Sequence, residues 1–248
     1  MTARLLGAAA LSVGALMALP LPLATRPAQP AQTAKPAPPA KPAPRLPDGK
    51  PDFSGVWSGG GGFNQRNLKP GDTIELLPAA KKLMDTRTGK WAEDPEAHCL
   101  PTGVPRMAPY PWRMVQSVDG KYVFILFEGN IHSYRQIFLD GRQHPKDPDP
   151  TWYGHSIGRW EGDTLVVDTV GYNDKFWFSA AGWPHTTRLH TIERFTRTDF
   201  NTLAWEITIN DPGAYAKPFT LQTRARLEAS WDLMEYICQE NNTNVAPR

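Results

Sequence analysis

Residues 202–227 read TLAWEITINDPGAYAKPFTLQTRARL and contain two runs in which apolar and polar side chains alternate. From Leu203 to Ile209, and again from Phe219 to Leu227, nearly every second residue is apolar and most of the residues between are polar or charged. Successive side chains of a β-strand point to opposite faces, so each run predicts a strand with one dry and one wet face. This pattern is typical of an antiparallel sheet or barrel.

Working outward, apolar runs separated by Asp-Gly or Gly-Asn pairs indicate further strands joined by tight hairpins. Strands are predicted at residues 53–57, 112–118, 121–128, 131–139, 154–160, 163–170, 188–198, 202–210, 217–228 and 232–238, and a helix at 77–85. We therefore expect an all-β fold: an antiparallel up-and-down (calycin-like) β-barrel of about nine or ten strands, with one short helix and long loops at one end. A two-sheet sandwich is the alternative.

The lengths of the connections predict which end of the barrel carries the function. In a meander, alternate connections lie at opposite ends, so the short turns 129–130, 161–162, 199–201 and 229–231 fall at one end and the long loops 140–153, 171–187 and 211–216 at the other. Long loops on a rigid scaffold are where binding sites usually lie. Aromatic and imidazole side chains in these loops are the predicted ligand-binding residues at this mouth: Trp152, Tyr153, Trp177, Trp183 and His185. The alternative is that they plug the barrel end.

The charges of the chain are unevenly distributed. Residues 1–50 hold six of the 27 basic residues and one of the 25 acidic ones, which leaves 21 basic and 24 acidic residues in 51–248. The folded part is therefore slightly acidic, which argues against a nucleic-acid partner.

The N-terminal segment has the layout of a secretory signal. Residues 5–24 are an uncharged apolar run behind Arg4, and we predict a signal peptide at 1–25, with a membrane anchor as the alternative. A Pro/Ala-rich disordered linker is predicted at 26–50 and a β-barrel domain at 51–248. We expect a periplasmic or secreted protein with no transmembrane span after signal cleavage.

Export would place the two cysteines of the chain, Cys99 and Cys238, outside the reducing cytoplasm. In an oxidising compartment they are expected to form a disulfide between the early segment and the last strand. A thiol nucleophile or a metal role for Cys99 is the less favoured interpretation.

Three residues are predicted to form a catalytic group. If Glu161-Gly162 is a two-residue turn, His155 lies opposite Asp168, with Cβ atoms about 5 Å apart. His190 begins the next strand at the same end. A carboxylate that fixes the tautomer of a histidine is what a general base requires. The predicted contact between His155 and Asp168 depends on the register in which their two strands pair, and both side chains could instead face outward into solvent.

Two arginines, Arg135 and Arg159, could bind a ligand carboxylate, although internal ion pairs are the more common role of such residues. The sequence has no G-x-S-x-G elbow, P-loop or dinucleotide fingerprint. It also lacks the usual zinc-ligand spacings, so we expect no cofactor and no metal.

Several motifs resemble those of a widespread group of exported bacterial proteins. They are PDFSGVW (51–57), GNIHSYRQIFLDGRQHP (129–145), IGRWEGDTLVVDTVGYND (157–174) and PHTTRLHTIERF (184–195). The group has no assigned activity, so the resemblance implies family membership and export rather than a reaction. Gly55-Val56-Trp57 also resembles the G-x-W of lipocalins and their calycin relatives, although the long segment 58–111 departs from their pattern.

These observations lead to three hypotheses about function. The first is an exported barrel that binds a small, largely apolar or aromatic molecule at its mouth. The second is a cofactor-independent acid–base enzyme of the isomerase, lyase, cyclase or hydratase type that uses His155 and Asp168. The third is a cell-envelope or polysaccharide interaction protein that uses its aromatic loops.

Overall fold

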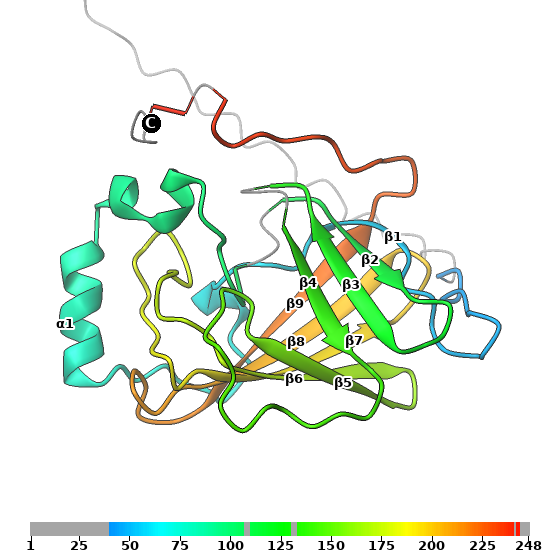
Figure 1. Cartoon of the computed structure of the whole chain (residues 1–248), viewed down its shortest axis with the longest axis horizontal. Coiled ribbons are helices and arrows are strands. Elements are labelled where there is room, and N and C mark those ends of the chain that lie inside the picture. The colour runs from blue at the N-terminus through cyan, green and yellow to red at the C-terminus, as the bar shows by residue number, and fades with distance from the viewer. Residues whose placement is uncertain (1–39, 107–109, 130–132, 241, 244–248) are drawn as a thin grey trace, which may run out of the picture. The chain divides into compact units, whose positions relative to one another are not determined.

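The computed structural model describes residues 40–106, 110–129, 133–240 and 242–243. Within them nine strands form a closed, mostly antiparallel barrel (Figure 1), which confirms the predicted all-β barrel. The strands are β1 (Gly55–Gly59), β2 (Trp112–Gln116), β3 (Tyr122–Phe127), β4 (Tyr134–Phe138), β5 (His155–Glu161), β6 (Thr164–Val170), β7 (His190–Arg197), β8 (Thr202–Asn210) and β9 (Phe219–Leu227). The α-helix of this part is α1 (Pro78–Arg87), where Pro78 occupies the first turn, a position that suits proline.

The alternating runs behave as predicted. In β8, Leu203, Trp205 and Ile207 are buried in the core, while the residues between them are partly exposed. Trp205 stacks on Phe195 of β7 with ring centroids 5.4 Å apart. Large side chains such as these fill the centre of the barrel, so its axis is occupied by packed core.

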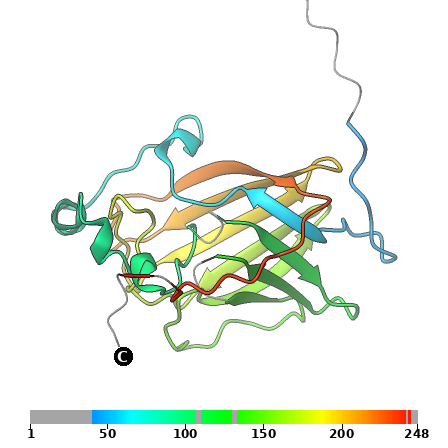
Figure 2. The ribbon, with the colours of Figure 1, turned by 90° about the horizontal axis from the view of Figure 1, so that it is seen from above.

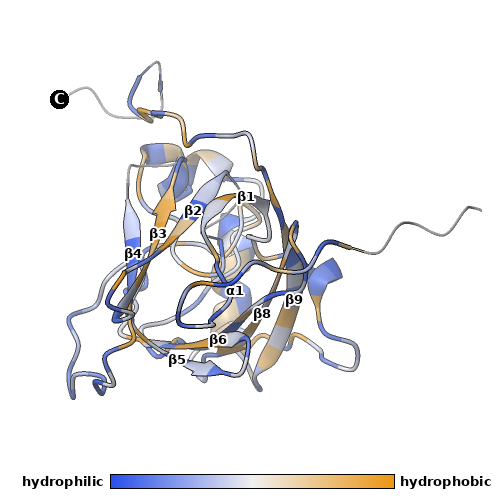
Figure 3. Cartoon of the chain, turned by 90° about the vertical axis from the view of Figure 1, so that its right-hand side faces the viewer, coloured by the Kyte–Doolittle hydropathy of each residue, from blue (hydrophilic) through white to orange (hydrophobic). Residues whose placement is uncertain are grey.

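One neighbouring pair of strands, β4 and β5, is parallel. An odd number of strands cannot alternate in direction all the way around a closed ring, so a nine-stranded barrel needs at least one parallel pair. Figure 3 looks into this ring, with β4 and β5 side by side. The prediction that every pair is antiparallel is therefore wrong at this one position. The β4–β5 junction, called the seam below, has a register of only two residue pairs.

The parallel pair changes where two connections lie. Parallel neighbours require a crossover, so residues 139–154 run from the short-turn end of the barrel back to the long-loop end. Consequently β3 ends and β4 begins at the long-loop end, so the predicted place of this connection among the short turns is wrong. The other connections lie as predicted, and α1 lies at the long-loop end (Figure 1).

The folded part begins earlier than residue 51. The Lys41 carbonyl accepts a hydrogen bond from the Phe200 amide at 2.8 Å, and Arg45 forms an ion pair with Asp163. The last residues of the predicted linker therefore pack against the short-turn end of the barrel. The predicted signal peptide and residues 26–39 lie outside the described residues. In the part of the chain that the structure describes, no helix reaches the length and apolarity needed to span a bilayer.

The C-terminal segment returns along the outside of the barrel and ends at the predicted disulfide (Figure 2). Cys99 and Cys238 are bonded, with Cα atoms 5.6 Å apart, and both side chains are buried. On the way, the Met234 amide donates to the Glu128 carboxylate at 2.9 Å. Residues 232–238 form no strand, contrary to prediction, because closure of the ring by β1 and β9 leaves no free edge for them.

Candidate functional site

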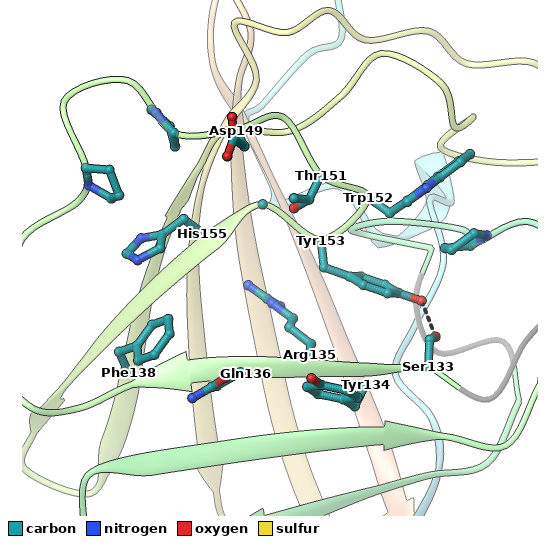
Figure 4. Close-up of a pocket in the computed structure, with 14 residues that line it drawn as sticks. Ser133, Tyr134, Arg135, Gln136, Phe138, Asp149, Thr151, Trp152, Tyr153 and His155 are labelled. Carbon is teal, nitrogen blue, oxygen red and sulfur yellow. Dashed lines mark hydrogen bonds between the residues drawn. The ribbon is translucent and has the colours of Figure 1, made fainter.

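The short seam leaves a cleft in the side of the barrel. β4 and β5 pair only at Ile137 with Ser156 and at Phe138 with Ile157. Beyond these pairs the start of β4 and the segment before β5 frame a hollow of about 730 Å³, called the seam cleft (Figure 4). Its lining includes Ser133, Tyr134, Arg135, Phe138, Trp152, Tyr153 and His155.

Aromatic and proline side chains form the apolar part of the walls of the seam cleft, beside polar residues such as Asp149. Tyr134 and Phe138 project from the outer face of β4, and the Tyr153 ring stacks on Phe127 with centroids 5.2 Å apart. The Tyr153 hydroxyl and the Ser133 hydroxyl are hydrogen-bonded at 2.9 Å (Figure 4). Burial raises the pKa of Tyr153 to about 12, so its hydroxyl keeps its proton at neutral pH.

Arg135 lies at the floor of the seam cleft and points into the barrel. Its Nη1 donates to the Glu193 carboxylate at 3.0 Å, and its Nη2 donates to the second oxygen of the same group. Nε donates to Ser156 at 3.1 Å and Nη2 to Thr169 at 2.9 Å. Burial is the largest single influence and opposes the charge, but the attraction and hydrogen bonding of Glu193, together with the nearby tyrosines Tyr172 and Tyr153, outweigh it and raise the pKa of Arg135. The residue thus forms the internal ion pair that is the common role of such arginines.

His155 does not lie opposite Asp168. The residue opposite His155 is Val170, and the one opposite Asp168 is Ile157. The predicted register is wrong by two residues because the turn consists of Gly162 and Asp163, closed by a Glu161–Thr164 pair. A shift of two keeps both side chains on one face, and that face is the outside of the barrel.

A fourth residue, His144 of the crossover, links two of the predicted catalytic residues, His155 and Asp168. His144 Nδ1 and His155 Nδ1 are 2.9 Å apart, and His144 Nε2 is 3.2 Å from Asp168 Oδ1. His190 Nε2 donates to the same oxygen at 2.8 Å. The predicted catalytic residues are therefore brought together, although His155 reaches Asp168 only through His144. Among the described residues, no three His, Cys, Asp or Glu side chains are grouped so as to hold a metal ion.

His155 belongs to both the His–Asp cluster and the seam cleft. Its ring stacks on Phe138 with centroids 5.2 Å apart and an interplanar angle of 21°. The desolvation of the ring, together with the charges of His144 and Arg142, lowers the pKa of His155. This shift favours the neutral imidazole, which is the form that accepts a proton.

Three predicted mouth residues pack against other side chains at the long-loop end. The His185 ring lies against Phe176 and Phe178, at centroid distances of 3.9 and 5.0 Å, and Trp177 is buried. Trp183 packs on Phe63 at 4.8 Å. These residues form an aromatic plug at the long-loop end.

Two further predicted ligand-binding residues have different surroundings. Trp152 is half-buried and lines the seam cleft beside Tyr153. Arg159 is exposed on the outer face of β5, forms an ion pair with Glu161 at 2.7 Å and does not line the seam cleft. Of the seven predicted ligand-binding residues, the seam cleft contains Arg135, Trp152 and Tyr153.

Sequence reasoning missed the roles of His144, Ser133 and Phe138. His144 lies in a loop of 16 residues between β4 and β5, where no periodicity fixes a position. The ten strands predicted could close a ring without a parallel pair, whereas the nine strands of the structure require one, with a crossover beside it. The crossover then places His144 next to the predicted His155 group.

The chain matches no protein-family profile, no curated protein and no solved structure. Membership of the exported bacterial group, and the likeness to lipocalins, thus stay predictions.

Proposed function

We propose that this barrel binds a small, largely apolar or aromatic molecule in the seam cleft. One observation carries the proposal: a hollow of about 730 Å³ lined by aromatic side chains opens where the barrel wall is incompletely paired. Ligand sites are typically hollows of about 300–1,000 Å³ with apolar walls and a few polar groups. The packed axis and the plugged mouth leave the side of the barrel as the best supported place for a ligand.

The polar groups of the cleft favour a neutral ligand with one hydrogen-bonding end. The hydroxyls of Tyr153 and Ser133 form a pair that can exchange one partner for a ligand oxygen. The positive charge of Arg135 is already balanced by Glu193 inside the barrel, so it does not select for an anion. The rings of Tyr134 and Phe138 supply flat apolar contact.

Titration with the neutral fluorescent probe N-phenyl-1-naphthylamine tests this proposal. The change Tyr134→Ser removes a ring that is 59% exposed, so the fold tolerates it. We expect the affinity for the probe to fall about two- to tenfold, the worth of one aromatic contact. The matched control is Trp91→Ser, which removes a ring that is 62% exposed and lies outside the cleft. Equal losses in both variants, or no saturable binding to the unchanged protein, would contradict the proposal.

We also propose that the protein works outside the cytoplasm. The apolar segment behind Arg4 and the Cys99–Cys238 disulfide support export. Sequencing the N-terminus of protein recovered from the periplasm or medium tests it, with cleavage near residue 25 expected. An intact N-terminus on protein that stays in the cytoplasm would contradict it.

Acid–base catalysis on the bound molecule is the second candidate function. The observation that favours it is that His155, the residue predicted to act as a base, lines the same cleft and is joined to His144 and Asp168. The polysaccharide hypothesis has less support, because Trp177 is buried and Trp183 is packed on the core.

A further inference from the structure

We propose that His155 Nε2 is a proton acceptor for the molecule bound in the seam cleft, and that His144 and Asp168 fix the tautomer that leaves this nitrogen bare. The inference rests on the proposed binding of a small molecule there. It assigns His155 as the catalytic residue and His144 as a positioning residue. The class of substrate is a neutral carbonyl compound with an acidic C–H next to the carbonyl group.

The hydrogen bonds dictate which ring nitrogens carry protons. An ionised carboxylate only accepts, so Asp168 Oδ1 receives protons from His144 Nε2, at 3.2 Å, and from His190 Nε2, at 2.8 Å. A neutral His144 with its proton on Nε2 has a bare Nδ1. That atom lies 2.9 Å from His155 Nδ1, which must then be the donor. The neutral His155 therefore carries its only proton on Nδ1, and its Nε2 has a free lone pair.

The surroundings of His155 leave that lone pair available. Within the described residues no group is hydrogen-bonded to His155 Nε2, and the ring borders the seam cleft. The charged and titratable groups near the ring include His144 and Arg142, whose guanidinium lies over the Phe138 ring at 3.8 Å, and Asp149 in the lining of the cleft. Arg142 is itself paired with Asp140 at 2.5 Å.

The hydrogen-bonded residues can also stabilise the positive charge that His155 gains with the proton. His155 Nε2 takes a proton from the carbon, and the electron pair of the broken C–H bond moves into the ligand to form an enolate. The Nδ1 proton of His155 can shift to His144 Nδ1, which places the positive charge beside the Asp168 carboxylate. Return of the proton from Nε2 to the same carbon, with the Nδ1 proton passing back from His144 to His155, completes an exchange or, at a stereocentre, an epimerisation, so no co-reactant is consumed.

Long-range ¹H–¹⁵N NMR of the ¹⁵N-histidine-labelled protein, without ligand, tests the tautomers. At pH 7 we expect protons on His155 Nδ1 and His144 Nε2. In Asp168→Asn we expect the two histidines to become tautomer mixtures, while the control His98, whose Nε2 donates to the Ala92 carbonyl at 2.9 Å, is unchanged. A proton on His155 Nε2 in the unchanged protein would overturn the inference.

Deuterium exchange of the α-protons of 2-tetralone in D₂O, followed by NMR, tests the proton transfer. The probe is neutral, aromatic and enolisable. We expect exchange above the buffer rate, a loss of at least a hundredfold in His155→Gln, and about tenfold in His144→Phe. His98→Gln should exchange like the unchanged protein. Exchange by His155→Gln at the unchanged rate would refute the assignment.

Two further readouts separate a positioning role and a binding failure from loss of catalysis. In His144→Phe the pH at which exchange falls to half should shift, since no residue then takes up the Nδ1 proton of His155 and passes the positive charge toward Asp168; an unshifted profile with reduced rate would count against the positioning role. The exchange rate of His155→Gln is measured at saturating 2-tetralone, so that weaker binding is not counted as lost catalysis. If the unchanged protein binds N-phenyl-1-naphthylamine but does not exchange 2-tetralone, the catalytic inference fails while the binding proposal stands.

Discussion

Removing either partner of the buried Arg135–Glu193 pair should destabilise the barrel strongly. The side chains are 1% and 0% exposed, and two parallel hydrogen bonds join them. In Glu193→Leu the guanidinium keeps only its bonds to Ser156 and Thr169 among those described above and loses the balancing charge. Breaking one side of a buried ion pair typically costs about 3–5 kcal/mol, and we expect the free energy of unfolding to fall by that amount in Glu193→Leu and in Arg135→Met.

The measurement is chemical unfolding followed by tryptophan fluorescence, with the disulfide intact. The double variant Arg135→Met with Glu193→Leu should lose much less than the sum of the single losses, because it leaves no buried charge. The matched control is Arg159→Met, which breaks an Arg–Glu pair whose side chains are 61% and 40% exposed. Such exposed pairs contribute about 0–1 kcal/mol.

Two results would refute this reasoning. One is a loss below about 1 kcal/mol in both single variants, as for an exposed pair. The other is a double variant that loses the full sum of the single effects, which would mean that the two residues act independently.

Three further predictions concern stability. Replacing both Cys99 and Cys238 by Ser should lower the free energy of unfolding by up to about 5 kcal/mol, since the disulfide joins residues 139 apart; unchanged unfolding of this variant would contradict it. Burial lowers the pKa of His185 to about 4, so the unfolded chain binds a proton that the folded chain excludes. Stability should thus fall by up to about 3 kcal/mol as the pH drops from 6.5 to 4, and less so in His185→Phe, as pH-dependent unfolding would show. Gly158→Ala should cost about 1–3 kcal/mol in thermal or chemical unfolding, because the added Cβ would lie 2.6 Å from Leu139 Cδ2 at the seam; an equally stable variant would show that the seam yields easily.

The strands were predictable because each carries its own pattern. β8 and β9 alternate residue by residue, and the α1 helix and the disulfide partners also follow from local signals and composition. The segment 232–238 shows the limit of such patterns. It reads like a strand, but a strand also needs an edge to pair with, and the closed ring offers none.

The candidate site was predictable only in part, because its geometry depends on one turn and one crossover. Residues 161–163 read Glu-Gly-Asp, and both dipeptides could form a two-residue turn. A glycine at the first central position, here Gly162 with a φ of +61°, suits the hairpin type that the structure uses. The position of His144 could not be read from its neighbours in sequence, since the path of the crossover is set by the whole ring.

The first strand of the barrel, β1, pairs with the last, β9. During synthesis the ring therefore has two open edges until β9 has left the ribosome, and its closure joins residues far apart in the chain, which makes folding slow. The order of the strands thus delays closure of the ring until β9 has been made.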